Sequence, residues 1–230
     1  MIVLGLETST AVCAAGLFVE GKPEVERSLL ESHVHSEKLL TLVQEVIAEA
    51  SLSLRDVHAV AISSGPGSFT GLRIGFSTAK GLCFSLNRPL VTVPTFEAIA
   101  VAARGKFAGA SEILVALDAK REEFYVGRFA TTQEGVESLG SVEVLSLKDT
   151  LSLARRNAAG LLITDKVELL KSGSGDTQLV EDVHQFCRAS IVARLGYRKA
   201  VRKEFADVAS VEPFYLKDFV VRMAMKTSLS

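Results

Sequence analysis

Hydrophobic residues follow two different periods along this chain. Apolar residues at helical spacing predict helices over 36–50, 72–86, 95–103 and 147–156, and 180–203 is expected to be mostly helical. Short apolar runs predict strands instead, because many of them are too short for a helix and are typical of buried strands. The predicted strands cover 2–7, 11–19, 25–31, 57–62, 90–93, 112–117, 122–130, 161–164 and a segment within 136–145.

The order of these elements predicts two lobes. Three strands come first, then three helices alternating with two strands, and a second half rich in strands follows. This order is typical of two related α/β units. The small and polar stretch 104–111 marks the boundary. We therefore expect a first lobe over 1–104 and a second, smaller and less regular lobe over 112–230. The Gly/Ser-rich stretch 171–177 predicts a loop, and 212–216, which holds Pro213, is expected to be extended.

A glycine-rich loop connects the strand at 57–62 to the helix at 72–86. It contains Gly65, Pro66 and Gly67, which favour a tight turn, and Ser68 or Thr70 can cap the helix that follows. Free N–H groups at a helix N-terminus attract anions. The spacing matches neither the dinucleotide-binding nor the P-loop motif, so a simple packing turn is an equally good interpretation.

The helix after this loop is apolar almost all round. Gly71, Gly75 and Ala79 share one smooth face, and larger apolar residues cover much of the rest. Such a helix is buried on more than one side, by a sheet and either a neighbouring helix or a partner subunit. We expect it to form a subunit interface with the helix at 36–50. The candidate interface residues are Gly65, Pro66, Gly67, Ser68, Phe69, Thr70, Gly71, Leu72, Arg73, Gly75 and Ala79.

Composition narrows the class of protein. The 230 residues are 48% hydrophobic and 23% charged, as in globular domains, and the net charge of −1 does not favour binding nucleic acid by overall charge alone. The three cysteines have no metal-site spacing, and the N-terminus lacks the basic region of a secretory signal. No apolar run is long enough to span a membrane. These features predict a cytoplasmic protein.

Several motifs resemble the TsaB (YeaZ) family. Their residues are Glu7-Thr8-Ser9-Thr10, His35-Ser36-Glu37-Lys38-Leu39-Leu40, the glycine loop at 64–75, Asp118-Ala119-Lys120-Arg121-Glu122-Glu123-Phe124-Tyr125 and Glu212-Pro213-Phe214-Tyr215-Leu216-Lys217. The resemblance implies an actin-like ATPase fold (ASKHA, ribonuclease H-like). It also implies a non-catalytic dimerisation subunit for synthesis of N6-threonylcarbamoyladenosine at position 37 of bacterial tRNAs.

The same resemblance implies the partners. They are TsaD, which transfers the threonylcarbamoyl group, the P-loop ATPase TsaE, and a second copy of this chain when it is isolated. The homodimer and the TsaD complex would use one surface. The tRNA, ATP and a metal ion would then belong to the assembled complex, with no cofactor held tightly by this chain alone.

Two departures from catalytic relatives support a non-catalytic role. TsaD carries metal-binding histidines in an Asn-His-x-x-Gly-His pattern, and Thr95 and Ile99 stand at those positions here. The first turn, Glu7 to Thr10, resembles the first phosphate loop of the actin-like fold, but it has glutamate for aspartate and lacks the following glycine. Without that glycine the backbone wraps a phosphate less closely.

Other interpretations stay open at this point. An actin-fold ATPase or small-molecule kinase would need an acid for Mg²⁺ and glycine loops from both lobes, and the second half offers only Gly173-Ser174-Gly175. A metal site at His33 and His35 lacks further ligands nearby, so His35 is expected to orient the start of a helix. The basic segment 188–203 is either a solvated helix face or a patch for tRNA phosphates.

Overall fold

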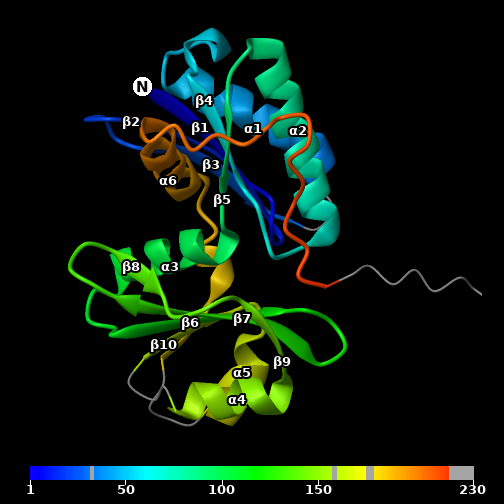
Figure 1. The fold of residues 1–230 in the computed structure, drawn as a ribbon, viewed down its shortest axis with the longest axis vertical. Coiled ribbons are helices and arrows are strands. Elements are labelled where there is room, and N and C mark those ends of the chain that lie inside the picture. The colour runs from blue at the N-terminus through cyan, green and yellow to red at the C-terminus, as the bar shows by residue number, and fades with distance from the viewer. Residues whose placement is uncertain (32–33, 157–159, 175–178, 218–230) are drawn as a thin grey trace, which may run out of the picture.

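The computed structural model describes residues 1–31, 34–156, 160–174 and 179–217, which form two α/β lobes (Figure 1). The first lobe has a five-stranded sheet in the order β3-β2-β1-β4-β5. In it β1 pairs antiparallel with β2 and parallel with β4, β3 is antiparallel to β2, and β5 is parallel to β4. Its strands are β1 (Ile2–Glu7), β2 (Val12–Val19), β3 (Val25–Leu30), β4 (Ala59–Ser63) and β5 (Leu90–Val93).

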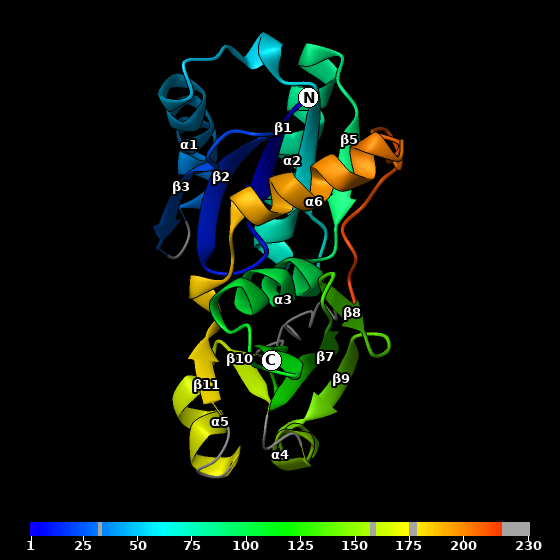
Figure 2. The same ribbon diagram turned by 90° about the vertical axis from the view of Figure 1, so that its left-hand side faces the viewer.

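Helices cover both faces of the first sheet. Helices α1 (His35–Glu49) and α2 (Phe69–Leu86) pack on one face, and α6 (Ala189–Val201) packs on the other (Figures 1 and 2). Side chains alternate along β1 accordingly, because Leu4 belongs to the core under α1 and α2 while Val3 belongs to the core under α6. A short 3₁₀ turn, η1 (Leu54–Asp56), precedes β4.

The second sheet has the order β11-β10-β6-β7-β8, and β9 also pairs with β7. Helices α4 (Leu147–Arg156) and α5 (Val167–Ser174) cover one face, while α3 (Thr95–Lys106) covers the other and lies between the two sheets. A second 3₁₀ turn, η2 (Val183–Gln185), leads to α6. The strands are β6 (Glu112–Asp118), β7 (Glu123–Thr131), β8 (Val136–Ser138), β9 (Glu143–Ser146), β10 (Leu161–Thr164) and β11 (Leu179–Asp182).

The division into lobes differs from the prediction in its C-terminal part. The chain changes sheets between β5 and β6, close to the predicted boundary at 104–111. However, α6 packs against the first sheet, and the segment after it hydrogen-bonds there too, with Ala206 N donating to Leu90 O. The assignment of 112–230 as one second lobe is therefore wrong for α6 and for the segment at Ala206.

Two local predictions were wrong, and a third is confirmed in its main part. The single strand expected within 136–145 is two short strands, β8 and β9, separated near Gly140, whose φ is +147°. The predicted loop at 171–177 is helical up to Ser174, and 175–177 lie outside the described residues. The region 180–203 is mostly helical, as predicted, through η2 and α6, although it begins with the end of β11.

The predicted Ser68 cap is confirmed, and the three helix starts near the site differ in their hydrogen bonds. Ser68 caps α2, and its Oγ accepts a hydrogen bond from Gly71 N. Ser36 lies inside α1, whose N-cap residue is Val34. Thr95 is the first residue of α3, and its hydroxyl accepts instead from Gly65 N at 3.0 Å. Thr95 therefore links the glycine loop to the start of α3.

Candidate functional site

The predicted first turn and the glycine loop lie side by side at one edge of the first sheet. The turn follows β1 and the loop follows β4, and these strands are parallel neighbours, so their carboxyl ends meet. The Ser68 N–H donates to Ser9 O at 2.7 Å. A Cβ added at Gly67 would lie 2.2 Å from the same Ser9 oxygen, so only glycine allows this approach.

Glu7 is buried in this turn, with 1% of its surface exposed. Its Oε1 accepts hydrogen bonds from Ser9 N at 2.6 Å and from Ser9 Oγ at 2.5 Å. Burial raises the pKa of Glu7, while the bonds from Ser9 oppose that shift. The nearby Ser63 hydroxyl also lowers this pKa. The carboxyl group thus turns into its own loop and does not face solvent.

The small face of α2 packs on the same turn. A Cβ at Gly71 would lie 2.1 Å from Thr8 O, and one at Gly75 would lie 2.2 Å from Thr8 Oγ1. Leu72 and Ala79 are fully buried as well. The predicted subunit-interface role is therefore wrong for Gly71, Leu72, Gly75 and Ala79, because their surface is used inside the lobe.

The remaining interface candidates divide by exposure. Gly65 and Pro66 are buried, and a Cβ at Gly65 would meet Phe214 O at 2.5 Å. Gly67 and Phe69 are partly buried, while Ser68, Thr70 and Arg73 are exposed. Only these last five have surface that a partner could contact.

The glycine loop directs much of its hydrogen bonding inward. Gly65 N donates to Thr95 Oγ1, Ser68 N to Ser9 O and Gly71 N to Ser68 Oγ. An anion site of the predicted kind needs such N–H groups unpaired at the helix start. The packing-turn interpretation therefore fits the observed geometry better than the anion-binding one.

The turn between β6 and β7 carries the motif at 118–125 of the family resemblance. Lys120, Arg121 and Glu122 have φ values of +63°, +58° and +59°, which non-glycine residues rarely adopt. Asp118 holds the turn by accepting 2.8 Å hydrogen bonds from Lys120 N and Lys120 Nζ. Partial burial raises the pKa of Asp118. These bonds and the Lys120 and Lys166 charges outweigh burial and keep the pKa below its usual value.

The motif at 212–217 connects the glycine loop to the β6–β7 turn. Phe214 N donates to Ser64 O at 2.8 Å, and the Tyr215 ring lies 5.0 Å from that of Phe69. Lys217 Nζ donates to Ala119 O at 2.8 Å and also pairs with Glu123. The C-terminal segment 212–217 thus contacts the glycine loop of one lobe and the β6–β7 turn of the other. Periodicity did not predict this meeting, since the three stretches are far apart in sequence.

His35 is the first residue of α1 and is 6% exposed. Its Nε2 lies 3.2 Å from Val12 O, so it ties the helix start to β2, as expected for an orienting residue. His33 lies outside the described residues. Within the described ranges, no three His, Cys, Asp or Glu side chains are grouped as a metal site would need. Thr95 and Ile99, which we expected to stand where TsaD has its histidines, are both buried.

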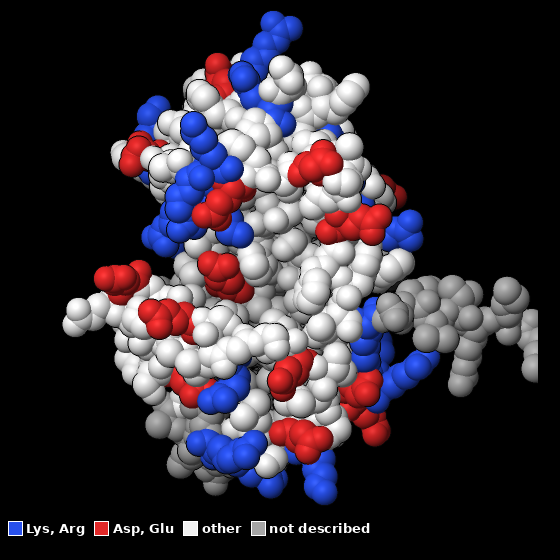
Figure 3. Space-filling view, in the orientation of Figure 1, with Lys and Arg blue, Asp and Glu red and all other residues white. Residues whose placement is uncertain are grey.

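The basic segment 188–203 is partly neutralised. Arg188 pairs with Glu26, Arg194 with Glu24, and Arg202 with Glu204. Figure 3 shows basic and acidic side chains intermixed on the face that it views. This pattern favours a solvated helix face over a continuous patch for phosphates.

The comparisons with known proteins identify the family. Residues 29–211 match the model of the family described as TsaD, tRNA N6-adenosine threonylcarbamoyltransferase, so the chain belongs to the family that this model defines. The tRNA threonylcarbamoyladenosine biosynthesis protein TsaB of Buchnera aphidicola subsp. Schizaphis graminum is 31% identical over 67% of this chain and 75% of its own. This chain belongs to the TsaB (YeaZ) family.

Other TsaB relatives match over shorter spans. The TsaB protein of Escherichia coli K12 is 33% identical over 59% of this chain, and the match spans 58% of the relative's length. A Pseudomonas aeruginosa structure, described as an uncharacterized protein with similarity to peptidase YeaZ, superimposes with a TM-score of 0.79. It is 27% identical over 94% of this chain and 99% of that one.

The structural neighbours also confirm the predicted actin-like fold. A dehydratase activator from Clostridium difficile with bound ADPNP matches with a TM-score of 0.52 at 10% identity, over 89% of this TsaB-family chain. At that identity the match shows the fold and nothing further.

The described serine and cysteine side chains lack the base that usually activates a peptidase nucleophile. Their serine hydroxyls and cysteine thiols make no hydrogen bond to a histidine ring that could act as base. Burial raises the pKa of Cys13 and of Cys83 to about 11, and it raises that of Cys187 as well. These thiols are therefore protonated and unreactive at neutral pH. In the same described ranges, no helix is both long and apolar enough to cross a membrane.

Proposed function

We propose that this chain is a non-catalytic subunit for synthesis of N6-threonylcarbamoyladenosine in tRNA, and that it binds a TsaD-type threonylcarbamoyltransferase. Membership of the TsaB family supports the pathway. The observation that carries the non-catalytic role is the closed first turn: Glu7, Thr8 and Ser9 are each at most 1% exposed. A working actin-type phosphate loop has to present its acid and backbone to nucleotide and Mg²⁺.

The partner surface that we propose is the outward side of α2, together with α1. Phe84 is 88% exposed, and Leu40 on α1 is 53% exposed. Between Phe84 and Arg73, the exposed positions include Ser77 and Gly81, and a Cβ at Gly81 would meet nothing within 4 Å. We call Arg73, Ser77, Gly81 and Phe84 the outer α2 surface. Small residues beside a large exposed aromatic suit close packing of a helix from another chain.

In this proposal a second copy of the chain occupies the same surface when TsaD is absent, so homodimer and heterodimer compete. TsaE, tRNA, ATP and a metal ion join through the assembled complex. Three free, buried cysteines suit a cytoplasmic location, where thiols stay reduced.

The test is reconstitution with purified components. The chain alone, supplied with threonylcarbamoyl-AMP and tRNA, is expected to form no modified nucleoside and to hydrolyse no ATP. Adding it to the TsaD-type partner from the same source should raise product formation over the partner alone, as measured by mass spectrometry of tRNA nucleosides. Product formed by the chain without the partner would overturn the non-catalytic role.

A further inference from the structure

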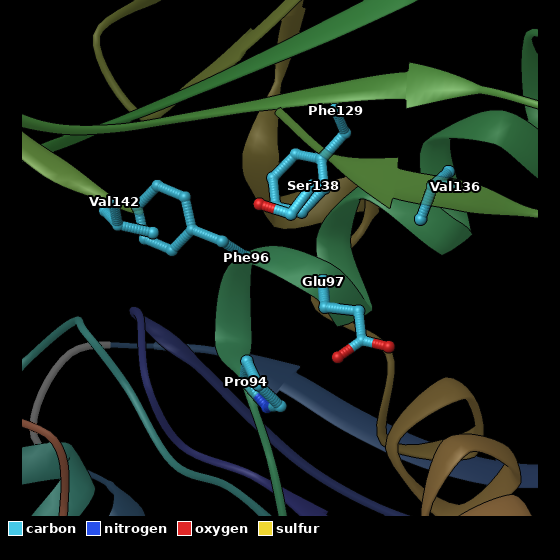
Figure 4. Close-up of a pocket in the computed structure, with 7 residues that line it drawn as sticks. All are labelled: Pro94, Phe96, Glu97, Phe129, Val136, Ser138 and Val142. Atoms are coloured by element: carbon cyan, nitrogen blue, oxygen red, sulfur yellow. The ribbon is translucent and has the colours of Figure 1, made fainter. Parts of the chain in front are cut away.

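A pocket of about 310 Å³ lies at the side of the second lobe that faces α3 (Figure 4). Its walls are apolar: Phe96 comes from α3, Phe129 from β7, Val136 from β8 and Val142 from the segment before β9. The two phenylalanines belong to the buried core, so the walls are held in place by the packing of α3 on the sheet. A volume at the lower end of the usual range for ligand sites suits a small molecule.

The polar side chains of the lining are acceptors. Glu97, in the first turn of α3, has no hydrogen bond or ion pair with any other described residue. Ser138 donates its own proton to Gly140 O at 2.5 Å, which leaves its oxygen free only to accept. None of the described residues that line the pocket is a lysine, arginine or histidine. The pocket is therefore matched to a donor with positive charge and is unsuited to phosphate or carboxylate.

We propose that this pocket binds a small organic ammonium ion, with its apolar body against Phe96 and Phe129 and its charged nitrogen at Glu97. Figure 4 shows the two rings on one side and the Glu97 carboxylate on the other, toward Pro94. Rings and carboxylate together provide both halves of such a site, because aromatic walls bind the apolar part and a carboxylate binds the cation. The site is separate from the outer α2 surface and does not depend on the proposed function.

The probe is 2-phenylethylammonium, and its neutral isostere 2-phenylethanol is the matched comparison. Both are titrated into the ¹⁵N-labelled full chain, and amide shifts are followed by NMR. We expect 2-phenylethylammonium to bind with a dissociation constant on the order of 1 mM and to shift the amides around Phe96, Glu97 and Phe129. It should bind about tenfold more tightly than the alcohol.

Two variants and one control separate the contribution of the Glu97 charge to binding from that of the cavity. Glu97→Gln should remove the preference for the cation, whereas Glu168→Gln, which alters an exposed acid in the first turn of α5, should leave it unchanged. Val136→Phe, at a half-buried position on β8, should abolish binding of both probes by filling the cavity. The proposal is overturned if neither probe binds at 10 mM, if the two bind equally, or if Glu97→Gln keeps the preference.

Discussion

At the scale of single residues, Gly75 and Gly81 of α2 have opposite surroundings. Gly75 lies against Thr8 and Ile62. A Cβ added at Gly75 would lie 2.2 Å from Thr8 Oγ1 and 3.0 Å from Ile62 Cδ1, while the space around Gly81 is open. A methyl group therefore has to displace the first turn at one position and only meets solvent at the other. Helix propensity favours alanine over glycine at both positions, so the difference between them reports packing alone.

We therefore predict that Gly75→Ala destabilises the protein by about 1–3 kcal/mol, because the new methyl group overpacks the contact with Thr8. Gly81→Ala should leave stability unchanged or raise it by up to about 1 kcal/mol. Urea unfolding followed by circular dichroism measures both. Equal stability of the two variants would show that the first turn moves away from α2 at no cost.

A second residue-scale prediction concerns Glu7 and pH. Its pKa is raised above 4.5 in the folded state, mainly by burial, so the folded protein holds this proton more tightly than the unfolded chain does. The contribution of Glu7 to stability is therefore most favourable below pH 4.5 and is lost as pH rises through the raised pKa. Glu7→Gln keeps an oxygen acceptor for Ser9 but cannot ionise.

We expect the stability difference between Glu7→Gln and the native chain to shift in favour of the variant as pH rises above 4.5. Urea unfolding at a series of pH values measures it. Glu45→Gln, an exposed change on α1, is the control and should track the native chain at every pH. Parallel curves for Glu7→Gln and the native chain would contradict the raised pKa.

At the scale of elements, α2 shows what periodicity can and cannot predict. Its helical spacing predicted the helix and its approximate ends, but a helix apolar almost all round gives no sign of which side faces outward. The face of Gly71, Gly75 and Ala79 was expected to meet a partner, and it meets Thr8 instead. The outward side could be recognised only once the position of the first turn was known.

This orientation predicts which changes weaken association. Phe84→Asp and Gly81→Leu should each weaken self-association and TsaD binding by about 1–3 kcal/mol, or roughly five- to a hundredfold, without lowering stability. Leu169→Asp, on α5 of the second lobe, changes a similarly apolar residue that is 46% exposed and should leave both unchanged. Sedimentation velocity, with and without TsaD, measures the effect. Native-like association of both α2 variants would place the interface elsewhere.

Elements of the second half were harder to predict for a physical reason. Helix α5 is only eight residues long and runs into a Gly/Ser-rich stretch, so it is shorter than the window of about 11–18 residues over which a helical pattern is recognised. Strand β11 is only four residues long, at the lower limit for recognising a strand pattern. Helix α4 was predicted with its bounds, Leu147–Arg156, because its apolar stripe is strong. The strand expected within 136–145 was interrupted by Gly140, which has a φ of +147°.

At the scale of the whole molecule, the chain returns to its first lobe after completing the second. Gly5 and Gly16 leave room for this return. A Cβ added at Gly5 would lie 2.2 Å from Ala189 O, and one added at Gly16 would lie 2.6 Å from Ser190 N. Small residues on β1 and β2 were therefore the available signal that a helix packs closely on that face. Local patterns could not identify which helix, because α6 is separated from those strands by the entire second lobe.

The segment after α6 then connects the lobes through Lys217. Its ammonium group donates to Ala119 O at 2.8 Å in the turn that also contains Lys120, Arg121 and Glu122. The pair with Glu123 contributes less, because the Glu123 side chain is 42% exposed and solvent screens it. Most of the effect of Lys217 should thus come from the charged hydrogen bond to the Ala119 carbonyl.

We predict that Lys217→Met loosens the β6–β7 turn while leaving both sheets intact. The loss should be about 1 kcal/mol, which lowers the melting temperature by about 2–4 °C in a protein of this size. Hydrogen exchange should become faster at the amides of Ala119 and Glu123, whose hydrogen bonds close this turn, and stay unchanged in β1 and β4. Lys148→Met, which alters an exposed lysine of α4 in the same lobe, is the control. Unchanged exchange at the turn in Lys217→Met would mean that Asp118 and Lys120 hold it without help from the C-terminal segment.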